Sequence, residues 1–361
     1  MQAMRRWVAA LSFALIACSQ QAAPIAHVSV SSSAQASPSP AGKPGYGLEP
    51  TGTPFIDLPV SPVAFSCRIP VYKSVANGVE DYFVTFPSGT ATADPNGVQG
   101  MYFDRAYSSW VPVGRGAVSP DGSHYAYIKA GQESGVFDVY IVDLVKGYGR
   151  AIQISSPGIK AQPDVFDYEP EGIYLVQAFE RIWPGVWLFD PSTGSVRKVA
   201  DVERPELIGA GGSLWFGQVN AADPSPFTTR SSAGILPDEV GRYDLRSGGR
   251  SSWLYRPGIS LEVIGVDVTG RPLIQVLVPG SNPNIASAGF VDHSRSELLL
   301  GLSPTSQRSI YKGALVETLR SPIADSHGVW FGSDHGIYLY SEAAGLLKVS
   351  DQPGIPANGC F

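Results

Sequence analysis

A sequence pattern that recurs six times between residues 101 and 349 limits the folds open to this chain more than any other feature. Each copy has an apolar strand, an Asp or its substitute, a few turn residues and a second strand, and successive copies are 39 to 54 residues apart. An Asp at the first turn position is typical of hairpins, because its carboxylate accepts hydrogen bonds from backbone N–H groups two residues on. We therefore interpret these residues as turn formers and not as catalytic acids. They are Asp104, Asp143, Asp190, Asp244, Asp292 and Ser341.

A further β-rich run precedes each copy, so that each unit of 40–50 residues contains about four short strands. Four strands per repeat are the signature of a propeller blade, as in WD-repeat-like proteins, and stacking blades in a ring covers the faces that a lone blade leaves bare. The 40 Gly and 30 Pro residues fit short strands and many turns. The sequence predicts an all-β fold: a single closed β-propeller of about six four-stranded blades, over residues 55–361.

The number of blades has one alternative. Residues 55–66 offer an extra strand that would close the ring, so that seven blades are the second choice. A β-sandwich is disfavoured, because it would not produce six similarly ordered units.

One blade carries a more specific motif. Ser119-Pro120-Asp121-Gly122, followed by the run HYAYI from His124, resembles the repeat of TolB-like propellers. The other blades keep the turn pattern without these letters. The resemblance implies a propeller fold, and it adds a TolB-like component of an envelope complex to the candidate functions.

Residues 1–18 have the features of a bacterial export signal. Arg5 and Arg6 precede a short apolar stretch, which is too short to remain as a membrane-spanning helix. The ending Leu-Ile-Ala-Cys resembles the lipobox of bacterial lipoproteins, which implies that Cys18 is diacylated and becomes the mature N-terminus. The serine after it implies the outer membrane if the cell has two membranes. The alternative is an ordinary signal peptide cleaved near Ala22 or Ala23.

Residues 19–54 are rich in Ala, Ser, Pro and Gly and have almost no periodic hydrophobicity. Such a segment buries too little apolar surface to offset its ordering entropy, so we predict a disordered tether between membrane and propeller. The net charge is −6, and loss of Arg5 and Arg6 with the leader would make it −8. A mildly acidic chain without a Lys/Arg run disfavours nucleic acid as a partner and leaves the acyl chains as the expected membrane contact.

Cys67 and Cys360 lie at the two ends of the predicted folded region. A disulfide persists in the oxidising compartment of an exported protein. A bond between these two residues would close nearly the whole domain and stabilise it by about 4–5 kcal/mol in the chain-entropy model. The bond requires neighbouring ends, as a circular fold predicts. We expect the disulfide, and two free buried thiols are the alternative.

Three acids take one equivalent position near the start of the innermost strand in three consecutive units: Asp164, Glu206 and Glu262. In a propeller these strand starts surround the mouth of the central channel. Three carboxylates there would bind Ca²⁺ or a cationic group. The alternative interpretation is that they are solvated residues at the strand entries.

Unequal connections between second and third strands give a second candidate surface at the same end. The connection in the fourth unit, over residues 219–240, is far longer than a hairpin needs, and long irregular loops in compact domains tend to be functional. An aromatic side chain beside Arg is a plausible anchor for a peptide or glycan. The candidate residues are Arg181, Trp183, Phe227 and Arg230; packing of Trp183 between blades is the alternative.

The sequence has no nucleophile elbow, no H-E-x-x-H or C-x-x-C motif and no Gly-rich phosphate loop. A group of acids and histidines in the last unit contains residue types that bind metals. However, the fourth unit has Gly and Ser at the matching positions, so we interpret the group as hairpin turns. Its members are Asp325, His327, Asp334 and His335.

We therefore expect a non-catalytic binding or scaffold domain for a protein or polysaccharide at the cell envelope, which is monomeric and has no cofactor. The alternatives are a Ca²⁺-dependent hydrolase or lyase acting at the channel mouth, and the TolB-like envelope component.

Overall fold

The computed structural model describes residues 57–131, 135–155, 159, 162–177, 185–202, 204–209, 212–220, 237–279, 291–313 and 319–361. These residues all belong to one compact unit, Leu48–Phe361. Arg181, Trp183, Phe227 and Arg230 lie outside the described residues, as does Cys18. No helix in the described ranges is long and apolar enough to cross a membrane.

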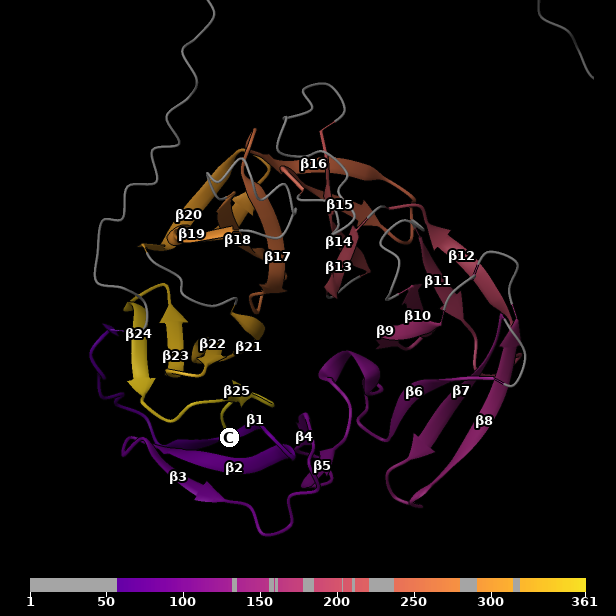
Figure 1. Ribbon diagram of the computed structural model, residues 1–361, viewed down its shortest axis with the longest axis horizontal. Coiled ribbons are helices and arrows are strands. Elements are labelled where there is room, and N and C mark those ends of the chain that lie inside the picture. Colours follow the sequence, from indigo (N-terminus) through magenta and orange to yellow (C-terminus); the bar gives the residue numbers. More distant parts are fainter. Residues whose placement is uncertain are drawn as a thin grey trace, which may run out of the picture. The chain divides into compact units, whose positions relative to one another are not determined.

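The described residues form six sheets of three or four strands and one separate two-stranded hairpin. The six sheets surround a common centre (Figure 1). This arrangement confirms the predicted six-bladed propeller. Blade 1 contains β25 (Ile355–Pro356), β1 (Cys67–Val75), β2 (Gly78–Phe86) and β3 (Thr90–Ala93), in that order from the centre outward. Blade 2 contains β6 (His124–Ala130), β7 (Val136–Asp143) and β8 (Tyr148–Ser155). In place of a full innermost strand, Val118 forms a single bridge with Tyr125.

The other four blades each have four antiparallel strands in chain order, with the first strand at the centre of the ring. Blade 3 contains β9 (Pro163–Glu169), β10 (Gly172–Gln177), β11 (Val186–Phe189) and β12 (Val196–Ala200). Blade 4 contains β13 (Arg204–Gly209), β14 (Ser213–Gln218), β15 (Glu239–Asp244) and β16 (Arg250–Tyr255). Blade 5 contains β17 (Ser260–Val266), β18 (Pro272–Pro279), β19 (Val291–Ser303) and β20 (Ser306–Gly313). Blade 6 contains β21 (Arg320–Asp325), β22 (Gly328–Ser333), β23 (Gly336–Ser341) and β24 (Gly345–Ser350).

The core lies between the blades, because each sheet buries apolar side chains on its neighbour. Ile173 and Phe189 of blade 3 pack against Val139 of blade 2, and all three are buried. Between blades 5 and 6, Leu273 packs with the fully buried Phe331. Removing these faces from water is the main favourable contribution of the ring.

Asp143, Asp190, Asp244 and Ser341 act as the turn residues that the sequence predicted. Asp292 does not: it lies within β19 and is paired with Val278 of β18, because that strand continues to Ser303 before the chain turns. The carboxylate of Asp143 accepts hydrogen bonds from the N–H groups of the residues two and three positions on, and Asp190 and Asp244 accept equivalent bonds. Side-chain hydrogen bonds from Lys146 to Asp143 and from Ser192 to Asp190, together with these backbone bonds, lower the pKa of both carboxyl groups, that of Asp190 to about 2. The backbone bonds lower the pKa of Asp244. In the last copy the hydroxyl of Ser341 accepts from the N–H of Ala344. The repeat is therefore a structural device.

The first copy of the repeat differs from the others. Its two strands, β4 (Tyr102–Asp104) and β5 (Ser109–Val111), form a separate two-stranded sheet and do not extend the sheet of β2. Phe103 and Trp110 of this hairpin pack with Ala357, Phe83 and Phe361, and so cover one face of blade 1. The short 3-10 helix η2 (Arg115–Ala117) follows the hairpin.

The ring closes at blade 1, where the C-terminal segment supplies the innermost strand. Val71 and Tyr72 of β1 pair with β25, and Arg68 exchanges two backbone hydrogen bonds with Phe361. The predicted extra strand before residue 67 is reduced to a bridge between Val60 and Lys348 of β24. The closing strand is therefore β25.

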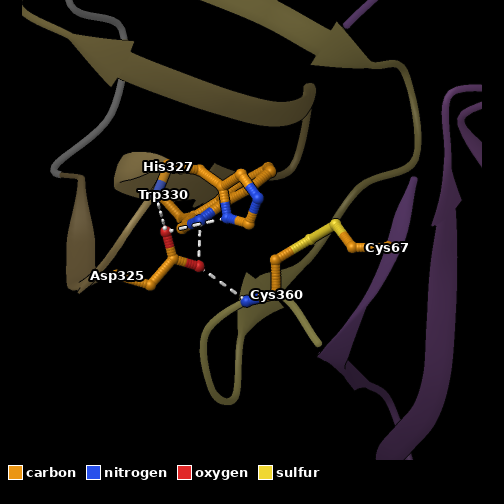
Figure 2. The surroundings of a disulfide bond; sticks show 5 residues. All are labelled: Cys67, Asp325, His327, Trp330 and Cys360. Atoms are coloured by element: carbon orange, nitrogen blue, oxygen red, sulfur yellow. Dashed lines mark hydrogen bonds and ion pairs between the residues drawn. A yellow bond between two sulfur atoms is a disulfide. The ribbon is translucent and has the colours of Figure 1, made fainter. Parts of the chain in front are cut away.

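The Cys67–Cys360 disulfide is present, with 5.7 Å between the Cα atoms, as predicted (Figure 2). Asp325 fixes the surroundings of the bond: its Oδ2 accepts hydrogen bonds from the N–H of Cys360 and from Nε1 of Trp330, at 2.7 and 2.8 Å. Its Oδ1 accepts from the N–H of His327. The turn at Asp325 and His327 is the one that the comparison with the fourth unit predicted, whereas the bond of Asp325 to Cys360 was not predicted.

Candidate functional site

The three predicted acids lie near the start of the innermost strands of blades 3, 4 and 5. Asp164 is paired with Val176 across β9 and β10, and Glu262 is paired with Gln275 across β17 and β18. Glu206 occupies a bulge in β13, where the register with β14 shifts. The three residues therefore occupy equivalent places in consecutive blades, at the end that we call the mouth.

Two of these acids are joined by an arginine that the sequence reasoning did not single out. Arg204 Nε lies 3.2 Å from Oε1 of Glu206, and Arg204 Nη2 lies 3.1 Å from Oε1 of Glu262. The other oxygen of Glu206 accepts a hydrogen bond from the N–H of Val263, so the same carboxylate bonds to the next blade. The Glu206 side chain is only 5% exposed and that of Arg204 16%, whereas Glu262 is 31% exposed.

This arrangement ties blade 4 to blade 5 with a charge-assisted pair at the mouth. A buried carboxylate is costly unless a cation and hydrogen bonds compensate it, and here the chain supplies both. Two of the three carboxylates proposed for Ca²⁺ therefore bind a guanidinium of the same chain. In the described ranges, no three His, Cys, Asp or Glu residues are grouped so that they could hold a metal ion.

Asp164 stands apart from this pair. It is exposed on β9, and none of the described ion pairs includes it. Its partial removal from water raises the pKa of its carboxyl group. Of the three acids, Asp164 is the one presented to solvent at the mouth.

The described residues beside the long connection of blade 4 form a fixed base for it. The N–H of Asn220 donates to Oδ1 of Asp238 at 2.8 Å, which brings together the two ends of the segment 221–236. Asp238 is fully buried, and its carbonyl oxygen accepts from the N–H of Arg256. The carbonyl of Pro237 accepts from the N–H of Leu261 in blade 5. Nothing in the sequence marks Asp238 beyond its place just before β15.

A second acidic group, also missed by the sequence reasoning, lies further along β9. Asp167 and Glu169 are two positions apart and so share one face of the strand, and they are hydrogen-bonded to each other. Removal from water and the charge of Glu169 raise the pKa of Asp167 to about 8, against a smaller opposing effect of Arg115. Burial and the nearby Glu171 also raise the pKa of Glu169.

The helix η2 packs against this part of β9. A Cβ atom at Gly116 would lie 2.7 Å from the carbonyl oxygen of Phe166, so the contact requires glycine. The approach of η2 contributes to the partial burial of Asp167, and it brings Arg115 near the two acids. The pair Asp167–Glu169 can therefore hold a proton at neutral pH.

Several solved structures are similar to this chain. TolB from Acinetobacter baumannii aligns with 81% of this chain and 65% of its own length, at 16% identity and a TM-score of 0.45. An oligogalacturonate lyase in complex with manganese aligns with 81% of this chain and 76% of its own length, at 14% identity and a TM-score of 0.43. An auxiliary nutrient binding protein from Bacteroides thetaiotaomicron aligns with 74% of this chain and 70% of its own length, at 10% identity and a TM-score of 0.37.

No family model matches the sequence, and no curated protein matches it significantly. The chain spans 65% of the length of the TolB structure. At these identities and scores the similarity concerns the propeller fold alone, and one such fold hosts many functions. Function is therefore argued from the residues of the mouth.

The ion pairs of Arg204 predict a strong effect of its removal. Arg204→Met takes the guanidinium away from the buried Glu206, so the free energy of unfolding should fall by about 3–5 kcal/mol. The double variant Arg204→Met/Glu206→Gln should regain much of this loss, because a neutral amide replaces the buried charge. Urea unfolding measures both. Arg197→Met, at an exposed position of β12, is the control and should change little. Equal losses of unfolding free energy in the single and double variants would contradict the assignment of Arg204 as the partner of the buried Glu206.

The raised pKa of Asp167 predicts a pH dependence of stability. An Asp carboxyl in an unfolded chain has its ordinary pKa of about 4, whereas the pKa of Asp167 in the folded chain is about 8. Between these values the folded state holds the extra proton, so stability should fall as pH rises, by up to about 1.4 kcal/mol per pH unit. Asp167→Asn should flatten this part of the curve in urea unfolding. An unchanged slope of stability against pH in this variant would show that another group causes the pH dependence.

Proposed function

We propose that this chain is an exported, lipid-anchored propeller that binds a protein or polysaccharide partner at the cell envelope through its mouth, without catalysis. The observation that carries the proposal is the fixed base of the segment 221–236: Asn220 and Asp238 hold its two ends together, and a network of buried hydrogen bonds supports them. Binding segments are commonly placed on a rigid scaffold in this way. We assign the contact to Phe227 and Arg230 of this segment and to Arg181 and Trp183.

Lipid anchoring at Cys18 places the mouth within reach of envelope partners. Residues 19–54 serve as the tether in this proposal, and the two acyl groups of a lipoprotein provide stable attachment. An envelope partner fits the acidic, Lys/Arg-poor composition, which offers no surface for nucleic acid.

The Ca²⁺-dependent hydrolase or lyase is a weaker candidate. The bonds of Arg204 to Glu206 and Glu262 weigh against a cation at this position, because an incoming Ca²⁺ would have to displace a guanidinium that is largely buried. A role as a TolB-like envelope component agrees with the proposed location and differs only in the identity of the partner.

The proposal is tested by site-specific photo-crosslinking in cells that express the full chain. A crosslinker at Phe227 should give an adduct with one envelope partner, and Arg230→Ala should reduce its yield. The same group at Ser192, an exposed turn position between β11 and β12, is the control and should give none. Cys18→Ser should release the chain from the membrane fraction and abolish incorporation of labelled palmitate.

Two outcomes would contradict the proposal. Equal adducts from Phe227 and Ser192 would show that the mouth is not the binding surface. Calcium binding by the purified chain that is lost in Glu206→Gln would favour the metal-dependent alternative instead.

A further inference from the structure

A pocket of about 690 Å³ lies at blade 1, away from the residues of the mouth. Strands β1, β2 and β3, the loop that follows β3 and the segment before β25 form its walls. Its volume is in the range of small-molecule sites, which is a few hundred to about 1,000 Å³. The polar residues used below are Lys73, Glu80, Asp81, Asp94 and Gln99.

Asp81 is the unusual residue of this pocket. It is only 7% exposed, and its Oδ2 accepts a hydrogen bond from the N–H of Gly100 at 3.0 Å. Its Oδ1 is buried and makes no hydrogen bond of normal geometry, although the N–H groups of Val98 and Gln99 lie near the carboxylate. Removal from water raises the pKa of this carboxyl group, in spite of the N–H groups of the loop. A buried acceptor without a well-placed donor is costly, so a donor from a ligand would be favoured at this atom.

The wall around Asp81 is held in place by close contacts. A Cβ atom at Gly97 would lie 2.8 Å from Cβ of Asp81, so the loop approaches the carboxylate as closely as only glycine allows. Gln99 adopts a positive φ of 60°, and its amide lies against Gly78 in the turn between β1 and β2. The pocket is therefore shaped before a ligand arrives.

Asp94 occupies the same wall in a fixed orientation. Its Oδ2 accepts a hydrogen bond from Nε1 of Trp110, and its Oδ1 accepts from the N–H of Asn96, both at 2.9 Å. The bond from Trp110 connects the pocket to the hairpin β4–β5 and adds to the apolar packing that holds this hairpin beside blade 1.

The charge of the pocket selects the ligand. Three acidic residues, Glu80, Asp81 and Asp94, and one basic residue, Lys73, line the pocket, so the lining has an excess of acidic groups. A primary ammonium carries the complementary charge and three N–H donors, which an aliphatic quaternary ammonium lacks. A metal ion is disfavoured, since no three acids, histidines or cysteines are grouped as ligands in the described ranges.

We propose that this pocket binds a small organic primary amine, with Oδ1 of Asp81 as the acceptor for its ammonium group. The site shares no residue with the mouth, so its success or failure is independent of the proposed function. It gives the propeller a second binding site, for a diffusible small molecule.

The test is a titration of the purified full chain with putrescine, followed by calorimetry and by the amide signals of Gln99 and Gly100. Binding should saturate and should perturb both signals. Asp81→Asn should weaken binding by about tenfold or more, the effect of losing one charge-assisted hydrogen bond. Its melting temperature should not fall, because the Asn carbonyl still accepts from Gly100 and no charge is buried. Tetramethylammonium should bind more weakly than putrescine.

Asp201→Asn is the matched control, since it makes the same change of charge at an exposed side chain, and it should bind putrescine as the wild type does. Three results would overturn the proposal. These are absence of saturable binding to the wild-type chain, equal binding to Asp81→Asn, and displacement of putrescine by Ca²⁺ at equal concentration, which would make the pocket a cation site of another kind.

Discussion

The pairing of the C-terminal strand with the first strand of the chain is the constraint on which the rest of the structure depends. Blades bury their apolar faces only against neighbours, so an open ring would leave blades 1 and 6 each with a bare face. β25 prevents this by joining β1 while the disulfide fixes Cys360 to Cys67. Asp325 of blade 6 accepts a hydrogen bond from the N–H of Cys360, so the closure involves both blade 1 and blade 6.

Much of this architecture could be predicted from the sequence because it is local and repeated. The Asp residues at the turns, the strand runs before them and the two distant cysteines led to the blade number and to the disulfide. The hairpin β4–β5 could not be predicted in the same way. Its sequence matches the repeat, but packing of Phe103 and Trp110 on Phe361 holds it against blade 1 as a separate sheet, and that contact joins residues far apart in the sequence.

The positions of the candidate site residues could also be predicted from the sequence, but their contacts could not. Strand alignment placed the three acids at equivalent positions, but it could not show that Arg204 would bind two of them across a blade boundary. Neither the pair Asp167–Glu169 nor the unpartnered oxygen of Asp81 has a sequence signature, because both depend on what the fold removes from water. The structure thus changes the interpretation of Glu206 and Glu262 from candidate cation ligands to parts of a rigid frame. A rigid frame suits a binding protein.

The closure is tested most directly by urea unfolding of the oxidised chain and of the double variant Cys67→Ser/Cys360→Ser. The bond closes a loop with a sequence separation of 293 residues, so the oxidised chain should unfold in one transition and be more stable by about 5–6 kcal/mol in the chain-entropy model, slightly above the value expected from the sequence. Equal stability of the two proteins would contradict the account, because it would mean that joining the two ends does not restrict the unfolded chain or hold the ring.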